Sequence, residues 1–88
     1  MSWRIEVKPA AERQYLSLDA NMRRRIKEAL RELETQDDPL RHPNVRALTG
    51  KLKGDYRLRV GGWRILFTPR REAKTLFVFA VLPRGKAY

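Results

Sequence analysis

Cysteine is absent from this 88-residue chain, and histidine occurs only once. Without thiols the chain forms no disulfide and no thiolate metal site, which fits a reducing cytosol. The first residues, MSWRIEVKP, lack the apolar run of a signal peptide, and no hydrophobic segment approaches the ~20 residues of a transmembrane helix. We therefore expect a single domain over residues 1–88, located in the cytoplasm and with no membrane as a partner.

Acidic residues are scarce in the second half of the chain. Residues 1–40 contain eight Lys/Arg and eight Asp/Glu, so their charges cancel, whereas residues 41–88 contain twelve Lys/Arg and only two acids. The net charge of +10 (12 − 2) therefore belongs entirely to the second half. This asymmetry favours a polyanion or an acidic protein as the partner of that half over a merely solubilising surface.

The residue types of common active sites are missing as well. His42 lies beside Pro43 in a segment of loop composition and is expected to be solvated. No pair of acids occurs at metal-ligand spacing, and no nucleophilic triad can be assembled. Gly61-Gly62 is too short for a phosphate-binding loop and is better explained as a turn. We expect no metal and no cofactor, so an enzyme of this sequence would work without the usual acid–base residues.

The apolar pattern predicts an α+β fold. Alternation over residues 3–7 indicates a strand, Pro9 suits the first turn of a helix over roughly 9–18, and Asp19 is a plausible N-cap of a second helix that ends before Pro39. An apolar stripe marks the second helix: Met22, Ile26, Ala29, Leu30 and Leu33. We expect the N-terminal strand and the helical hairpin to pack on one face of a small, mainly antiparallel sheet.

Residues 56–67, YRLRVGGWRILF, predict a β-hairpin around Gly61-Gly62, since two-residue turns need positive φ at both central positions. Arg59 then pairs with Arg64, and side chains alternate between the two faces. The apolar residues share one face: Tyr56, Leu58, Val60, Trp63, Ile65 and Phe67. The other face carries Arg57, Arg59 and Arg64. Because like charges directly opposite destabilise a sheet, we expect a compensating partner from outside the chain.

The rest of the second half predicts further strands. Residues 45–52 are typical of a broken strand, and residues 68–74 of a polar connection. The continuous apolar run LFVFAVL, residues 76–82, predicts a strand buried on both faces, with Phe77 and Phe79 in the core. Pairing of this strand with the one that begins at Trp63 would bring Arg84 close to the hairpin arginines. Four guanidinium groups around one point would bind a phosphodiester and stabilise charge developing on it.

Residues 56–67 and the C-terminal VLPRGKAY resemble the RelE branch of the RelE/ParE toxin superfamily. The shared pieces are a YRLRVG-type strand, a G-x-[aromatic]-R-I-L-F return strand and a basic C-terminal motif that ends in tyrosine. LTGKLKGD and the helix pair fit the same layout, so the resemblance covers nearly the whole chain. It implies a type II toxin that cleaves mRNA in the ribosomal A site, and a cognate antitoxin that wraps round it. The implied reaction is metal-free attack of a ribose 2′-OH on the adjacent phosphate.

The resemblance also implies the site residues. The implied catalytic set is Arg57, Arg59, Arg64, Arg84 and Tyr88. The implied RNA- and phosphate-binding set comprises these four arginines with Lys51, Lys53 and Lys86. Relatives have lysine where this chain has Arg57 and Arg59, and arginine is a poor general base because it stays protonated. Proton transfer would therefore fall to Tyr88, to water or to the ribosome.

Two other functions remain open at this point. A ParE-like protein would inhibit DNA gyrase by binding, which needs no arginine cluster at a phosphate, and the PRGKAY ending counts against it. The arginine-for-lysine changes keep open a third possibility, a catalytically silent domain that binds RNA or an antitoxin. Cleavage assays on ribosomes and supercoiling assays with gyrase would discriminate among the three.

Overall fold

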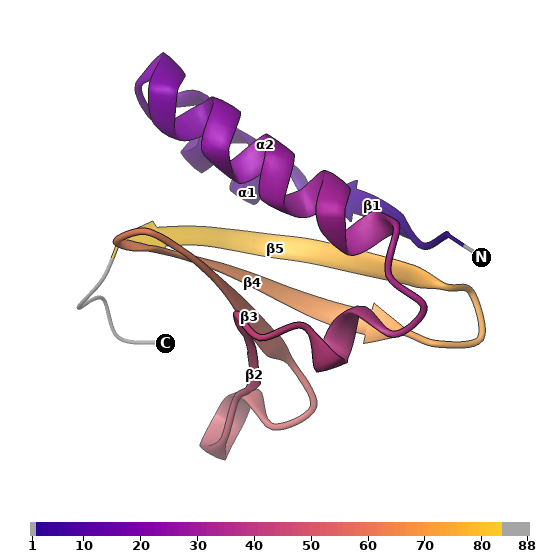
Figure 1. Ribbon diagram of the computed structural model, residues 1–88. Coiled ribbons are helices and arrows are strands. Elements are labelled where there is room, and N and C mark those ends of the chain that lie inside the picture. The colour runs from indigo at the N-terminus through magenta and orange to yellow at the C-terminus, as the bar shows by residue number, and fades with distance from the viewer. Residues whose placement is uncertain (1, 84–88) are drawn as a thin grey trace.

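The computed structural model describes residues 2–83. Its strands are β1 (Arg4–Val7), β2 (Val45–Ala47), β3 (Tyr56–Val60), β4 (Trp63–Arg70) and β5 (Thr75–Pro83). Its helices are α1 (Pro9–Leu16) and α2 (Ala20–Glu34), with short 3₁₀ turns η1 (Pro39–Arg41) and η2 (Gly50–Leu52). The strands form one sheet in the order β1-β5-β4-β3-β2, in which only the β1–β5 pair is parallel. Both helices lie over one face of this sheet, which confirms the predicted α+β fold (Figure 1).

The two helices begin where their sequences allow. Pro9 occupies the first turn of α1, where a backbone N–H would have no partner. The Asp19 side chain accepts a hydrogen bond from the Met22 backbone N–H at 2.8 Å and so caps α2 as predicted. Helix α1 ends two residues before the predicted position, and Arg23 of α2 donates to the Leu18 carbonyl beyond its end. Neither helix of the described chain is long and apolar enough to cross a membrane.

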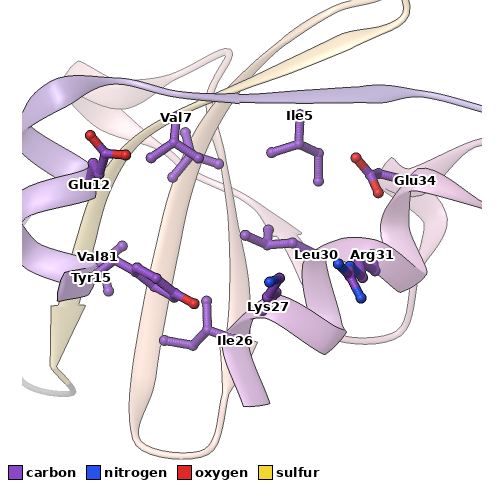
Figure 2. Close-up of a pocket in the computed structure, with 11 residues that line it drawn as sticks. Ile5, Val7, Glu12, Tyr15, Ile26, Lys27, Leu30, Arg31, Glu34 and Val81 are labelled. Atoms are coloured by element: carbon purple, nitrogen blue, oxygen red, sulfur yellow. The ribbon is translucent and has the colours of Figure 1, made fainter. Parts of the chain in front are cut away.

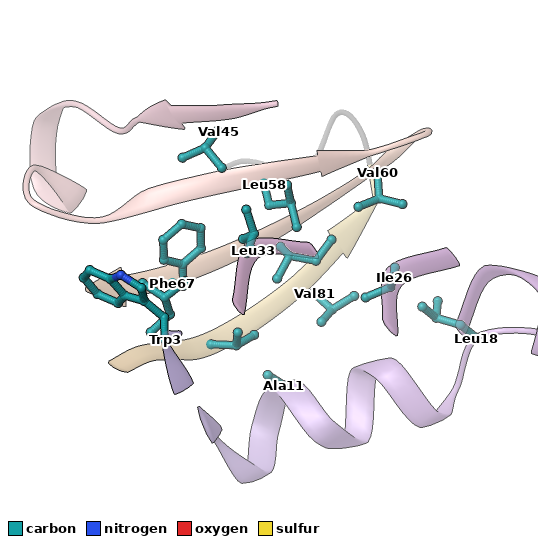
Figure 3. Close-up of a cluster of buried hydrophobic side chains, with 13 residues drawn as sticks. Trp3, Ala11, Leu18, Ile26, Leu33, Val45, Leu58, Val60, Phe67 and Val81 are labelled. Carbon is teal, nitrogen blue, oxygen red and sulfur yellow. The ribbon is translucent and has the colours of Figure 1, made fainter. Parts of the chain in front are cut away.

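The hydrophobic core fills the space between the helices and the sheet (Figure 3). Ile26 and Leu33 of α2 and Ala11 of α1 are fully buried there against strand residues such as Leu58 and Phe67. Burial of each large aliphatic or aromatic side chain contributes roughly 1.5–3 kcal/mol, so this layer carries most of the stabilisation. The helices therefore leave the opposite sheet face as the only extended surface of β3 and β4 that the core does not use.

The central hairpin has the predicted register. Tyr56 pairs with Phe67, Arg59 with Arg64 and Val60 with Trp63. The turn differs in one respect, because only Gly61 has a positive φ (57°). A type II′ turn needs positive φ only at its first central residue, so the expectation for Gly62 was wrong.

Strand β5 is not buried on both faces, contrary to the prediction. A β-bulge opposite Leu66 and Phe67 places one extra residue, Phe79, between the paired residues Val78 and Ala80. Phe77 and Phe79 are only half-buried and lie outside the core, because the face to which Phe77 points carries no helices.

Strand β4 is longer than predicted, since it continues to Arg70 through Thr68 and Pro69. Proline is tolerated there because β3 begins at Tyr56, opposite Phe67, so β4 has no neighbour on that side beyond this point. Residues 45–52 resolve into the short strand β2 and the turn η2, which begins at Gly50 with φ 69°.

Candidate nucleic-acid interface

The sheet face opposite the helices carries four arginines on three neighbouring strands. Arg46 of β2 lies opposite Arg57 of β3, and Arg59 of β3 lies opposite Arg64 of β4. Residues in register point to the same face, so the four side chains form one surface, which we call the arginine face. The predicted convergence of Arg57, Arg59 and Arg64 on one face is therefore confirmed.

Arg46 was missed by the sequence analysis because the segment around it contained too few residues to assign a register. The alternation of Val45, Arg46 and Ala47 is the signal that marks it, once β2 is known to pair with β3. With Arg46 included, the arginine face holds two directly opposed pairs of like charge instead of one. The arginine face therefore has more positive charge than the sequence alone predicted.

Most of this positive charge has no carboxylate partner among residues 2–83. Within residues 2–83, no carboxylate lies within 4.0 Å of the guanidinium group of Arg46, Arg59 or Arg64. Asp55, which directly precedes β3, instead accepts a hydrogen bond from the Thr68 hydroxyl at 2.7 Å. Arginine is hydrated more weakly than lysine and is well suited to phosphate, so an uncompensated group of this kind is a ready site for a polyanion.

Backbone carbonyls position several of these side chains. The Asn44 carbonyl accepts hydrogen bonds from Arg57 Nη1 at 3.2 Å and from the Arg59 backbone N–H at 2.9 Å. Arg64 Nη1 lies 3.5 Å from the carbonyl of Trp63. The residue before β2 is thus joined to β3 by two hydrogen bonds.

An apolar patch adjoins the charges on the same face. Leu66 is 1% exposed and lies in register between Arg57 and Ala80, and Leu82 lies opposite Arg64. Apolar surroundings keep water away and lower the local dielectric, which strengthens the attraction between a guanidinium group and a phosphate. The combination of positive charge and apolar surface is better suited to binding a phosphodiester than to keeping the chain soluble.

The remaining predicted residues are distributed differently. Lys51 and Lys53 are exposed in the β2–β3 connection, beyond the start of β3 and away from the Gly61-Gly62 turn. The structure therefore places them at the far end of the strand that carries Arg57 and Arg59. The last three predicted residues, Arg84, Lys86 and Tyr88, lie outside the described residues.

His42 is not solvated, contrary to the prediction. Its Nε2 pairs with the Glu32 carboxylate, its Nδ1 accepts the Asn44 backbone N–H at 3.1 Å, and its side chain is 11% exposed. This histidine fastens the end of α2 to the loop before β2 and is not directed at the arginine face. In the described part of the chain, no three His, Asp or Glu side chains gather as metal ligands.

A separate hollow of about 350 Å³ lies on the helical side, between β1, α1 and α2. Ile5 and Val7 of β1 face Leu30 and Ile26 of α2 across it (Figure 2). Two acids and two bases also line it: Glu12, Glu34, Lys27 and Arg31. Because these charges balance and the walls are apolar, this hollow does not suit a polyanion, and the arginine face remains the candidate phosphate site.

Comparison with protein families matches residues 5–88 to the family described as ParE toxin of type II toxin–antitoxin system, parDE. Comparison with curated proteins finds no match. The matched range includes β2, β3 and β4 and therefore the whole arginine face.

Several solved structures share the fold. The archaeal RelE–RelB complex from Pyrococcus horikoshii OT3 matches with a TM-score of 0.79 and 27% identity, over 99% of this chain and 100% of that chain. The intact E. coli RelBE toxin–antitoxin complex matches with a TM-score of 0.71 and 21% identity, over 98% of this chain and 100% of that chain. A YoeB/ParE toxin from Agrobacterium tumefaciens matches with a TM-score of 0.76 and 16% identity, over 92% of this chain and 98% of that chain. The latter two likenesses establish the fold alone.

Proposed function

Because this chain belongs to the ParE toxin family of type II toxin–antitoxin systems, within the RelE/ParE superfamily, we propose that it is a ribosome-dependent mRNA endonuclease that inhibits translation. The observation that carries the proposal is the arginine face, where Arg59 opposes Arg64 without a described carboxylate partner. An mRNA phosphate between these two side chains would relieve their repulsion and accept forked hydrogen bonds.

The proposed reaction needs no external nucleophile. The ribose 2′-oxygen attacks the adjacent phosphorus, the bond from phosphorus to the 5′-oxygen breaks, and a cyclic phosphate and a 5′-hydroxyl result. Arg57, Arg59 and Arg64 would stabilise the negative charge that builds up on the phosphate oxygens. Arginine stays protonated and is a poor general base, so Tyr88, water or the ribosome would take the proton of the 2′-hydroxyl and would supply the proton that the leaving 5′-oxygen needs.

The other proposed participants follow from the same chemistry. Arg84 and Tyr88 would complete the catalytic set, and Lys51, Lys53 and Lys86 would guide the RNA backbone as flexible point charges. We propose a cognate antitoxin as the neutralising partner, with an acidic or amphipathic segment that covers the arginine face. Carboxylates of such a segment would take the place of RNA phosphates between the opposed arginines.

Cleavage on programmed ribosomes tests this function. Purified chain is incubated with ribosomes that carry a defined mRNA, and cuts are mapped by primer extension for the wild type, Arg64→Ala and Arg13→Ala. Arg13 lies exposed on α1, away from the arginine face, and serves as a charge-matched control. We expect codon-phased cuts from the wild type and from Arg13→Ala, and a loss of at least about a hundredfold in Arg64→Ala, the size typical of a lost charge-stabilising donor.

A gyrase supercoiling assay run alongside separates the alternatives. The matched family is described by the ParE name, so gyrase inhibition is the second candidate function. If the folded wild type cuts no mRNA but blocks supercoiling, the endonuclease proposal is wrong and the chain is a gyrase inhibitor. Inactivity in both assays would leave a domain that binds RNA or its antitoxin without catalysis.

A further inference from the structure

A second hollow, of about 190 Å³, lies on the same sheet face as the arginines, toward the end away from the Gly61-Gly62 turn. Lys8, Thr68, Arg70 and Phe77 line it. Thr68 and Phe77 are register partners on β4 and β5, and Arg70 lies two residues beyond Thr68 on the same face. We call these four residues the β4–β5 hollow.

Phe77 gives this hollow an aromatic surface beside two cations. Its ring is half-buried, and the Lys8 ammonium lies 5.6 Å from the ring centroid. A cation over an aromatic ring is held only weakly at an exposed site, so the ammonium can exchange the ring for an anion. Nucleic-acid-binding proteins hold single strands with this combination, in which a base stacks on the ring and cations take its phosphates.

The acids nearest to the hollow are engaged by other groups. Glu6 is the register partner of Phe77 on β1, and the Arg4 guanidinium pairs with its carboxylate at 3.3 Å. Asp55 accepts the Thr68 hydroxyl, as described above. Within residues 2–83, neither Lys8 nor Arg70 forms an ion pair. Both cations of the hollow are therefore available to an incoming phosphate.

We propose that the β4–β5 hollow is a second binding subsite for single-stranded RNA. One base stacks on Phe77, and its flanking phosphates pair with Lys8 and Arg70. This inference rests on the proposed function, because the arginine face would hold another part of the same RNA strand. Arg64 and Arg70 are six residues apart on β4, or about 20 Å at the rise of a strand, so only an RNA of several nucleotides reaches both subsites.

The test compares binding of a short and a long RNA to the purified chain. Fluorescence anisotropy measures affinity for single strands of roughly four and roughly twelve nucleotides, with 2′-O-methyl groups that prevent cleavage. The variants are Phe77→Leu, which keeps an apolar side chain but removes the ring, and Arg70→Gln. Arg13→Gln is the charge-matched control, since Arg13 is exposed on α1, outside the hollow and away from the arginine face.

We expect Phe77→Leu to weaken binding of the long RNA about tenfold, the effect of one lost stacking platform, and Arg70→Gln to weaken it several-fold. Binding of the short RNA should change little, because the arginine face carries the larger charge. Arg64→Ala should weaken binding of both RNAs, and Arg13→Gln should weaken neither. Thermal melting monitored by circular dichroism checks that each variant is folded.

Wild-type affinity for the long RNA in both Phe77→Leu and Arg70→Gln would overturn the subsite. If Arg64→Ala still lost both RNAs in that case, the proposed function would survive without the subsite. A wild type that binds neither RNA would overturn the subsite, whereas cleavage on programmed ribosomes would still decide the proposed function.

Discussion

Arg59 and Arg64 lie directly opposite one another on β3 and β4, one residue pair away from the turn that joins the two strands. Arg46 and Arg57 repeat this arrangement between β2 and β3. Opposed like charges cost stability in a sheet, and replacing one arginine of each pair would remove the cost. Their presence together is explained if the face is shaped for an anion and not for the stability of the free chain.

The repulsion itself can be measured. Arg64→Gln should raise the free energy of unfolding by about 0.5 kcal/mol at low salt, because it relieves a directly opposed pair, and the gain should shrink as salt is added. Urea denaturation at two ionic strengths gives both quantities. Arg70→Gln is the control, since Arg70 is exposed and lies opposite an uncharged residue, Thr75. A lower stability of Arg64→Gln at low salt would contradict the expected strain.

The β3–β4 turn should tolerate alanine at one glycine but not at the other. Gly61 has φ 57°, and a Cβ there would lie 3.1 Å from Nη2 of Arg25, whereas Gly62 has no atom within 4 Å of its Cβ position. Gly61→Ala should therefore cost about 1–2 kcal/mol of unfolding free energy, and Gly62→Ala much less. Thermal or urea unfolding checks this.

At the same turn, the cost of backbone strain at Gly61 can be separated from the cost of the contact with Arg25. In an Arg25→Ala background, Gly61→Ala keeps its backbone strain but loses the contact with the guanidinium group. A smaller penalty there than in the wild type would show that Arg25 packs on the turn. Equal penalties for Gly61→Ala and Gly62→Ala in the wild type would contradict the turn geometry described here.

The parts of the fold that local patterns specify were predictable from the sequence. The hairpin register follows from a two-residue turn and strict alternation, and the start of α2 follows from the capping chemistry of Asp19. For the same reason Arg57, Arg59 and Arg64 were placed correctly on one face.

The features that escaped prediction depend on contacts between distant segments. Arg46 lies on the arginine face because β2 pairs with β3, which is not evident from β2 alone. Likewise, β1 pairs in parallel with β5, which lies about 70 residues further along the chain. The bulge at Phe79 and the pairing of His42 with Glu32 likewise have no signature in the neighbouring residues. Loop-forming composition predicted an exposed histidine, and a tertiary contact overrode it.

Gln14 of α1 completes the hydrogen bonding of β5 and should matter for stability. Strand β1 ends at Val7, so the outer edge of β5 beyond Val78 has no strand partner, and the Val81 backbone N–H instead donates to Gln14 Oε1 at 2.8 Å. Gln14→Met should cost about 1–3 kcal/mol, because it leaves a buried donor unpaired at similar side-chain volume. Gln14→Glu keeps an acceptor and should cost less. Equal stability of Gln14→Met and the wild type would show that water replaces the contact.

The salt dependence of the RNA affinity should show how many phosphates the arginine face neutralises. Each phosphate neutralised on a single strand contributes about −0.7 to the slope of log K against log salt. Arg59→Gln should therefore make the slope of an uncleavable RNA shallower by about 0.7, whereas Arg59→Lys should keep the slope and lose affinity, because lysine keeps the charge but not the planar fork. Arg13→Gln, on the exposed face of α1, should change neither quantity. An unchanged slope in Arg59→Gln would mean that Arg59 holds no phosphate, and the arginine face would then be better explained as a surface for an acidic protein.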